Sequence, residues 1–376
     1  MVNGEILFRK PSWPLYRKLA VLVLGLTGLG VVMVTNTTFV FAGQKYGNPY
    51  FFLQKQLLFA ALGSIAFIFA QKIDLNNLRR FSRPILLAVL ILLVAVLIFG
   101  AEIKGARRWL SFGPFSFQPS ELAKLAVILY LADFLDRKSS KIRNPFLSFI
   151  PPGLLIGIAI VLIFAGRDLG TVMLIAGVVI LLYFTAGAPL KYLGVLVLTV
   201  LSGGSLAICL SPFRRTRILS FLSPESDPTG ISYQINQSII GVGNGGLFGQ
   251  GPGRGFQKLF YLPEGHTDFI FANIAEDLGF FGSALFIALF FFLVHWGFQT
   301  AKRSTNRFQS LLATGIISLI GVQTILNLSV VIGLFPTKGT TLPFISYGGS
   351  SLLCTLFAAG LLVNIARNLP PEDFRI

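Results

Sequence analysis

Asp268 has the residue type and the sequence position that a catalytic base needs. It stands directly before a long apolar run, 269–299, and follows a stretch rich in glycine and proline. A carboxylate at such a boundary can accept hydrogen bonds from the first N–H groups of a helix, or it can take a proton from a substrate hydroxyl. Both roles stay open here. Glu276 and Asp277 enter the same run, where charges should face protein or water rather than lipid.

Cationic residues lie in segments that carry few other charges. Arg107 and Arg108 precede Trp109, and Lys338 is the only charge between 333 and 351. A guanidinium group binds phosphate or carboxylate through two parallel hydrogen bonds, so the arginine pair indicates an anionic partner. Anchoring among lipid headgroups beside the tryptophan is the alternative.

Three more charges lie inside or beside apolar runs. Glu121 and Lys124 are three residues apart, which places them on one helix face as an ion pair requires. Asp168 follows Arg167 where two runs meet, so it either caps a helix or lines a polar cavity. Because charges within a span are costly, all three are candidates for substrate binding as well as for structural pairing.

Hydroxyls and glycines give weaker signals. Ser346 and Ser350 have no His or Asp in a context that would activate a nucleophile, so we expect them to satisfy backbone groups at helix ends or to contact substrate. The glycine-dense stretch 241–253 could wrap a phosphate, but no Gly-Lys-Ser/Thr sequence follows it. With only two Cys and two His in the chain, no cofactor is indicated and no metal site is predicted; help from Mg²⁺ or Mn²⁺ stays open.

The composition requires that these residues be positioned by membrane helices. Of 376 residues, 54% are hydrophobic and 12% are charged, against roughly 25% charged in soluble domains. These values exclude a soluble enzyme, a disordered chain and a disulfide scaffold. We predict an all-α polytopic membrane protein, a single domain over 1–376, whose ten transmembrane helices occupy the following ranges: 19–42, 51–70, 85–101, 117–136, 147–166, 168–187, 190–211, 269–299, 310–335 and 344–366.

Basic residues orient these helices. The net charge is +16, which fits the positive-inside rule of membrane proteins better than a nucleic-acid partner. With the N-terminus inside, 18 basic residues lie on the inner side and 12 on the outer side, five of them in the long segment 212–268. Short loops count most, so both termini are predicted in the cytoplasm and 212–268 outside, between the seventh and eighth helices. The 269–299 run is too long for one span, so its first ten residues should stand at the interface.

Taken together, the motifs resemble those of the SEDS family (shape, elongation, division and sporulation) of membrane glycosyltransferases. The matching segments, in this order, are 105–124, 168–171, 233–238, 245–251, 262–279 and 333–351. The last of them is similar to the cell-division (FtsW-like) branch rather than the elongation (RodA-like) branch, which usually lacks the lysine found here at 338. One departure is Gly166-Arg167 before Asp168, where the family usually reads Gln-Pro.

The resemblance implies polymerisation of lipid II, the undecaprenyl-pyrophosphate-linked disaccharide-pentapeptide, into glycan strands at the outer face of the cytoplasmic membrane, at the division septum. It implies Asp268 as the catalytic carboxylate, an inverting reaction, and a class B penicillin-binding transpeptidase with other division proteins as partners. The residues that it implies for the substrate cavity are Arg107, Arg108, Glu121, Lys124, Asp168 and Lys338, to which we add Ser346 and Ser350. A RodA-like polymerase, a lipid II flippase and a recruiting scaffold are the alternatives.

Overall fold

Helices make up most of the part of the protein that the structure describes. The computed structural model describes residues 13–103, 105–113, 115–222 and 230–370, and in each of the ten predicted ranges it places a helix. These helices are α1 (Leu15–Tyr46), α2 (Phe51–Ala70), α4 (Ser82–Phe99), α5 (Pro119–Arg137), α7 (Ile150–Ala165), α8 (Leu169–Thr185), α9 (Leu190–Cys209), α12 (Ile270–Arg303), α13 (Arg307–Val331) and α14 (Gly349–Arg367). Seven are long and apolar enough to cross a membrane (α1, α2, α4, α9, α12, α13 and α14), while α7 and α8 are shorter. The chain is therefore a helical, polytopic membrane protein.

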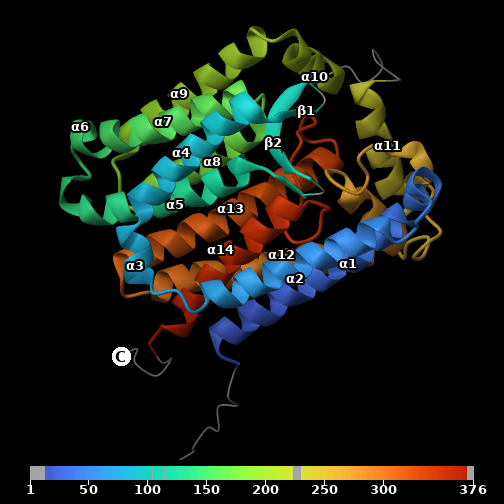
Figure 1. Cartoon of the computed structure of the whole chain (residues 1–376), viewed down its shortest axis with the longest axis horizontal. Coiled ribbons are helices and arrows are strands. Elements are labelled where there is room, and N and C mark those ends of the chain that lie inside the picture. Colours follow the sequence, from blue (N-terminus) through green and yellow to red (C-terminus); the bar gives the residue numbers. More distant parts are fainter. Residues whose placement is uncertain (1–12, 104, 114, 223–229, 371–376) are drawn as a thin grey trace, which may run out of the picture.

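The helices differ strongly in burial. Nearly every residue of α5 is buried, whereas α9 buries only Leu193 and Ala207. Figure 1 shows α5, α13 and α14 in the middle of the bundle, with α4, α7 and α9 on one side and α1 and α2 on the other. The short helices α3 (Leu75–Arg80) and α6 (Pro145–Ser148) lie at one end of the bundle. The central helices can thus hold polar side chains away from lipid.

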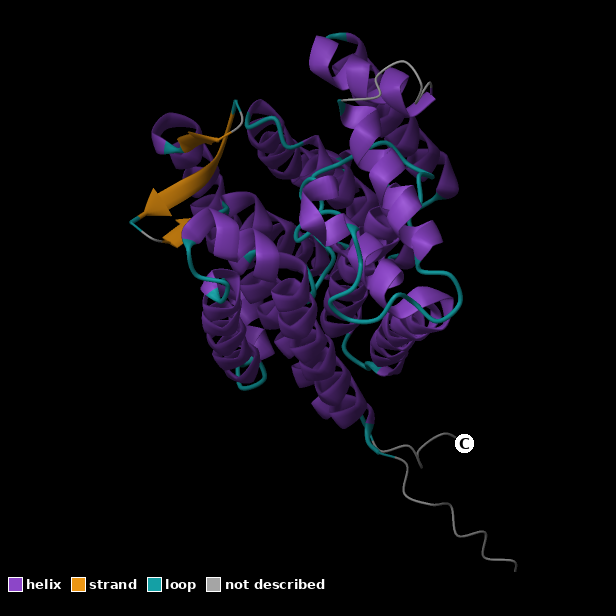
Figure 2. Cartoon of the chain, turned by 90° about the vertical axis from the view of Figure 1, so that its right-hand side faces the viewer, coloured by secondary structure: helices purple, strands orange, loops and turns teal. Residues whose placement is uncertain are grey.

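A small antiparallel sheet departs from the all-α prediction. Strands β1 (Ala101–Ile103), β2 (Ala106–Phe112) and β3 (Phe115–Phe117) pair in that order, at the edge of the molecule in Figure 2. Helices α4 and α5 consequently end and begin two residues short of the predicted limits at 101 and 117. The sequence prediction placed 102–116 in the connection between two helices and gave it no strands, and Gly105 (φ 73°) and Gly113 (φ 62°) adopt the turn conformations between these strands.

The segment 212–268 also contains more structure than its sequence indicated. It holds α10 (Pro212–Leu222), α11 (Ile231–Asn244) and a five-residue helical turn, η3 (Gln257–Tyr261). Its residues 223–229 lie outside the described part of the chain. Because these helices are short and α11 ends in glycines, the sequence pattern hid them.

Helix α12 bends at Gly279, so its long run is not one straight helix, while the position of its first ten residues at the membrane interface stays a prediction. Gly279 has φ 66° and ψ −165°, and Ile270 to Asp277 before it are all buried. The glycine-dense stretch packs against this bend: Phe280 N donates to the Gly246 carbonyl (2.9 Å). A Cβ on Gly249 would lie 2.2 Å from the Asp277 carbonyl oxygen. Glycines in this stretch therefore permit close backbone contact with α12. The possibility that the stretch wraps a phosphate stays a prediction.

Candidate active site

The fold decides how Asp268 is used. The N-cap residue of α12 is Phe269, whose side chain forms no capping hydrogen bond, so Asp268 does not hold the N-cap position that one of its two alternatives gave it. Its backbone carbonyl accepts a hydrogen bond from Asn327 Nδ2 (2.8 Å), and the same Nδ2 donates to the Thr340 carbonyl (2.7 Å). Asn327 of α13 thereby connects Asp268 to the segment 332–348 that leads into α14.

This connection brings Asp268 close to Lys338. A Cβ on Gly339, the next residue after Lys338, would lie 3.6 Å from Asp268 Oδ2. Lys338 Nζ is buried, has no hydrogen-bond partner among the described residues, and lies 4.7 Å from the centre of the Phe335 ring. Burial lowers the pKa of Lys338 to about 8. A buried cation with unused donors suits an anionic ligand.

Four arginines lie near one another, and one of them, Arg217, interacts with Asp268. Burial is the main cause that lowers the pKa of Arg217, Arg108 lowers it further, and Asp268 opposes both effects. Burial lowers the pKa of Arg214 as well, followed by Arg108 and Arg167. Like charges repel, so a cluster of four arginines is costly unless a polyanion neutralises it. We call these four residues, Arg108, Arg167, Arg214 and Arg217, the arginine cluster.

Each member of the cluster is fixed by the backbone. Arg108 Nε donates to the Gly166 carbonyl (2.9 Å), and its Nη2 donates to the Arg167 carbonyl. Arg167 Nη1 donates to the Gly105 carbonyl (2.7 Å), and Arg217 Nη1 to the Thr337 carbonyl (3.3 Å). The guanidinium of Arg214 lies 4.2 Å from the centre of the Phe164 ring and donates from Nη1 to the Ala207 carbonyl (3.2 Å). The sheet, the α7–α8 turn and α10 are therefore joined through these side chains.

Arg107 does not share this position. It alternates with Arg108 along β2, more than half of its side chain is exposed, and its ion pair with Glu102 has a length of 3.6 Å. An exposed pair of this kind contributes little stability. The two arginines, adjacent in sequence, thus have different surroundings.

Asp168 is the N-cap of α8, and this confirms the structural alternative for it. Its carboxylate accepts from Thr171 N (3.1 Å) and Thr171 Oγ1 (2.9 Å), and also from Gln118 Nε2 (3.1 Å) and Ser120 Oγ (3.2 Å). Arg167 turns away with φ 62°. Proline cannot adopt that φ, so this turn cannot have the conformation of the family's usual Gln-Pro.

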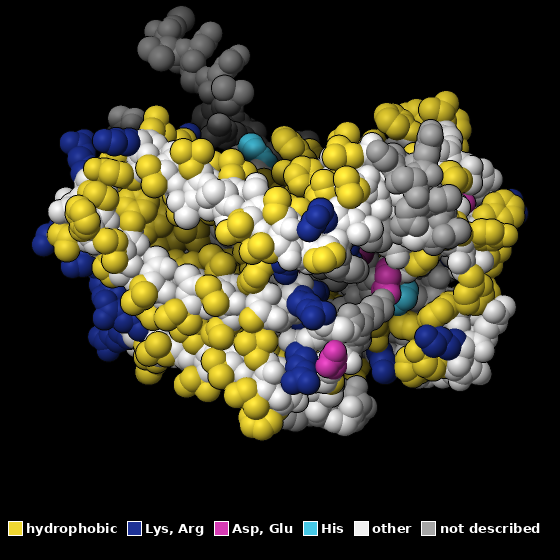
Figure 3. All heavy atoms as spheres, turned by 90° about the horizontal axis from the view of Figure 1, so that it is seen from above, with side chains coloured by type: hydrophobic (Ala, Val, Ile, Leu, Met, Phe, Trp, Pro, Cys, Tyr) yellow, Lys and Arg dark blue, Asp and Glu magenta, His cyan; other side chains and the backbone are white. Residues whose placement is uncertain are grey.

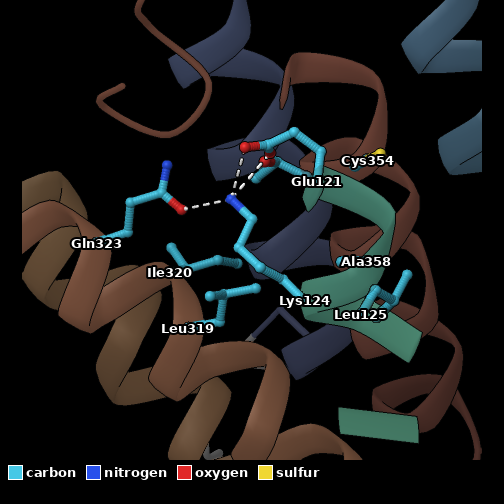
Figure 4. A pocket seen from close by; sticks show the side chains of 9 residues that line it. Glu121, Lys124, Leu125, Leu319, Ile320, Gln323, Cys354 and Ala358 are labelled. Carbon is cyan, nitrogen blue, oxygen red and sulfur yellow. Dashed lines mark hydrogen bonds and ion pairs between the residues drawn. The ribbon is translucent and has the colours of Figure 1, made fainter. Parts of the chain in front are cut away.

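Glu121 and Lys124 form the predicted ion pair. Lys124 Nζ lies 2.9 Å from Glu121 Oε1 and 3.3 Å from Gln323 Oε1, and both charged side chains are buried (Figure 4). Gln323 Nε2 donates in turn to the Thr341 carbonyl (2.8 Å). The cavity beside the pair has a volume of about 10 Å³, roughly the room that one water needs. Through Gln323, the pair therefore supports the segment 332–348. The cavity beside it is too small for a sugar.

The two serines satisfy backbone groups. Ser346 Oγ donates to the Thr267 carbonyl (2.6 Å) and accepts from Leu342 N (2.8 Å). Ser350 Oγ accepts from Gln118 N (3.2 Å) and donates to the Ser116 carbonyl (3.2 Å). Ser346 acts directly on the residue before Asp268, so its contribution to the site is positional.

The other acidic residues of α12 also face protein. Asp277 pairs with Lys258 Nζ (2.8 Å), and the Glu276 carboxylate accepts from Phe256 N and Gln257 N (3.0 Å each). Among the residues that the structure describes, no group of three His, Cys, Asp or Glu side chains could hold a metal ion.

The sequence missed three contributors to this site. Arg214 and Arg217 lie in a segment that looked like loop, and Asn327 lies in the middle of an apolar run. An asparagine in such a run is a polar group that needs a partner, and this is the signal that could have revealed it.

Comparison with known proteins shows the family and agrees with the fold. Residues 17–370 match the model of the FtsW/RodA/SpoVE family of cell cycle proteins. A relative from Geobacter metallireducens named probable peptidoglycan glycosyltransferase FtsW is 44% identical over 351 residues, with 93% of each chain covered. Stage V sporulation protein E of Bacillus subtilis is 42% identical, over 93% of this chain and 96% of its own.

Solved structures show the same arrangement of helices. One chain, from a peptidoglycan synthase complex that coordinates polymerization and crosslinking, has a TM-score of 0.76 and 31% identity, covering 93% of this chain and 96% of its own. The rod shape determining protein RodA of Thermus thermophilus has a TM-score of 0.70 and 27% identity, covering 94% and 97%. With its family model matched over almost its whole length, the chain belongs to the FtsW/RodA/SpoVE (SEDS) family of cell cycle proteins.

Proposed function

We propose that this chain is a peptidoglycan glycosyltransferase that polymerises lipid II for septal cell-wall synthesis. The observation that carries the proposal is that the Asp268 carboxylate interacts with Arg217 of the arginine cluster and lies beside the backbone at Gly339, next to the buried amine of Lys338. A base beside several fixed cations suits the transfer of a sugar away from a pyrophosphate. The relatives named peptidoglycan glycosyltransferase FtsW support the same activity.

The reaction follows from the charges of these groups. Asp268 accepts the proton of the acceptor sugar's hydroxyl as its oxygen attacks the anomeric carbon of the donor. The bond from that carbon to the pyrophosphate oxygen breaks, and undecaprenyl pyrophosphate leaves with the bonding electrons. Lys338, Arg108 and Arg217 stabilise the charge that grows on the leaving group. A single displacement inverts the anomeric centre, so no covalent intermediate on the protein is needed.

We further infer that all ten helices cross the cytoplasmic membrane, with both termini inside and the active site outside. Figure 3 supports this: Lys and Arg side chains gather at the end of the bundle where α3 and α6 lie, and hydrophobic side chains cover the surface beside them. A basic end faces the cytoplasm in most membrane proteins. Asp268 lies at the other end of α12 from Lys302 and Arg303, so this orientation places it outside.

A class B penicillin-binding transpeptidase, together with other division proteins, completes the proposal as partner. The support is the similarity to a chain from a peptidoglycan synthase complex. A RodA-like elongation role and a lipid II flippase remain the competing functions, and one experiment separates the polymerase from the flippase.

The experiment replaces Asp268 by Asn, which keeps the shape of the side chain and removes the base. We expect Asp268→Asn to insert into the membrane and bind lipid II. Its rate of polymerisation should fall by roughly 10²–10⁴-fold, the usual contribution of a general base. Labelled glycan is measured on a gel and lipid II translocation in vesicles, from one preparation with a matched transpeptidase. Glu102→Gln, an exposed carboxylate in the nearby sheet, is the control and should polymerise normally.

Two results would contradict the proposal. Near-normal polymer from Asp268→Asn would remove Asp268 from the base role. No polymer from the wild type, together with robust translocation, would identify a flippase instead.

A further inference from the structure

A basic hollow lies at the end of the bundle away from Asp268. It has a volume of about 560 Å³ and is lined by residues of α3, α4 and α5, among them Asn76, Arg79, Arg80, Ser82, Arg83 and Arg137. Helix α3 marks its place in Figure 1, and Figure 3 shows basic side chains gathered at that end. The glycosyltransferase reaction uses none of these residues.

Two of the four arginines are already neutralised. Arg79 pairs with Asp133 (3.0 Å) and Asp136 (2.8 Å), and Arg137 pairs with Asp133 (2.7 Å). The buried Ser82 donates to Asp133 (2.8 Å), so this carboxylate is fixed and has little left to offer a cation. These contacts form a rigid wall for the hollow.

The other two arginines leave an excess of positive charge. Arg80 ends α3 and Arg83 lies in the first turn of α4, and neither has an ion pair within the described residues. Both are exposed. Two guanidinium forks at the rim of one hollow suit the oxygens of a phosphate group.

The surface of α4 continues from Arg83 into an apolar stripe. Leu87, Ile91, Val94 and Ile98 follow it at helical spacing, and between 42% and 69% of each side chain is exposed. These residues therefore share one face with Arg83. Since α4 is apolar enough to span the membrane, this face meets acyl chains directly beyond the arginine.

We propose that this hollow binds the phosphate of an anionic phospholipid in the leaflet that surrounds it, with the headgroup on Arg80 and Arg83 and an acyl chain along the stripe. A free phosphate would use the arginines but not the stripe, and an acidic protein segment would need no apolar face beside them. The proposed orientation makes this leaflet the cytoplasmic one, where anionic lipids attract basic groups. Apart from this orientation, the lipid site does not depend on the proposed function.

The test measures lipid binding directly. Native mass spectrometry of the full chain in detergent gives the dissociation constant of the tightest site for dioleoylphosphatidylglycerol, with dioleoylphosphatidylcholine as the zwitterionic comparison. We expect the double variant Arg80→Gln/Arg83→Gln to weaken the first lipid roughly 10- to 30-fold, and to leave the weaker second lipid unchanged. Arg80→Lys/Arg83→Lys keeps the charges without the forks and should lose only part of the affinity.

A matched control removes two charges elsewhere on the same end. Lys141→Gln/Arg143→Gln changes two exposed basic residues that do not line the hollow and should bind phosphatidylglycerol like the wild type. Size-exclusion profiles and thermal melts confirm that each variant is folded. Asp268→Asn should also bind the lipid normally, so failure of the polymerase proposal and failure of this one have different signatures.

Three results would overturn the inference. Equal affinity of the wild type and Arg80→Gln/Arg83→Gln for phosphatidylglycerol would remove the site. Full displacement of the lipid by millimolar inorganic phosphate would assign the hollow to a soluble phosphate. Displacement by a hexaglutamate peptide at micromolar concentration would assign it to an acidic protein segment.

Discussion

At the scale of single residues, the candidate site is defined by which charges are already used. Asp168, Glu121 and Lys124 have their hydrogen bonds satisfied inside the protein, so their contribution is to position backbone. Lys338 has donors without partners among the residues described. The pKa of Arg217 is lowered by Arg108 and raised by Asp268, so Arg217 interacts with both. We therefore expect Lys338 and Arg217, rather than the satisfied residues, to contact the substrate.

Lys338 predicts a pH dependence. Burial lowers its pKa to about 8, so the free enzyme loses this cation as the pH rises through 8. Bound pyrophosphate favours the protonated form and raises that pKa, so the loss should appear in kcat/KM and much less in kcat. Lys338→Arg stays charged and should lack the decline. Lys338→Gln should lower kcat/KM roughly 10- to 150-fold, which corresponds to about 1.5–3 kcal/mol of lost transition-state stabilisation. A profile that is flat in the wild type from pH 7 to 9 would contradict this role.

The arginines predict a ranking of variants. Arg217→Ala and Arg108→Ala should each raise the KM for lipid II, because both belong to the arginine cluster beside Asp268. Arg107→Ala should have the smallest effect, because its side chain is more than half exposed and pairs only at 3.6 Å with Glu102. Arg217→Lys should recover part of the activity, since a point charge replaces a planar fork. Equal loss in all three alanine variants would show that membership of the arginine cluster does not matter.

At the scale of elements, backbone contacts between distant segments build the site. The bend of α12 at Gly279 lets residues 270–277 stay buried beside 332–348 while the rest of the helix continues into the apolar layer. The glycine-dense stretch covers this bend with backbone hydrogen bonds, Gln250 N to the Glu276 carbonyl (2.9 Å) and Gly251 N to the Asp277 carbonyl (3.0 Å). A change in this contact should therefore reach Asp268 through the first part of α12.

Gly249 tests that contact. It has φ 81°, and a Cβ would lie 2.2 Å from the Asp277 carbonyl, so Gly249→Ala should destabilise the fold by about 1–3 kcal/mol and reduce polymerisation. Gly243 is the matched control: it lies in α11, and a methyl group added there would meet no neighbouring atom within 4 Å, so Gly243→Ala should be neutral or slightly stabilising. Thermal melts in detergent compare the two. An unchanged melting temperature in Gly249→Ala would show that the bend can move away.

The sequence predicted the helices well and their connections poorly, for a physical reason. Apolar runs report contact with lipid or core, and this signal placed every one of the ten helices within about five residues of its ends. Short strands and α10 depend on tertiary contacts that no local pattern records. Asp268 and Lys338 were identified as candidates, but Arg217 and Asn327 were not, because their importance comes from residues far away in the chain.

At the scale of the whole molecule, the distribution of charge predicts the orientation, and the orientation decides whether the site faces its substrate. Under this orientation 18 basic residues lie on the inner side. Seven lie in the short outer loops, so turning the chain over would move the more basic side across the membrane. The membrane potential and anionic lipids both oppose that movement.

Cysteine labelling tests this orientation. The background is Cys209→Ser, which removes the exposed native thiol, while Cys354 is buried. Ser111→Cys in β2 and Thr305→Cys after α12 then introduce single exposed reporters near opposite ends of the molecule. A membrane-impermeant maleimide on intact spheroplasts should label position 111 at once and position 305 only after permeabilisation. The reverse pattern would place Asp268 and Lys338 in the cytoplasm, where undecaprenyl-linked donors would have to be used before they are exported, and the proposed outer-face polymerase would be wrong whatever the variants of its site had shown.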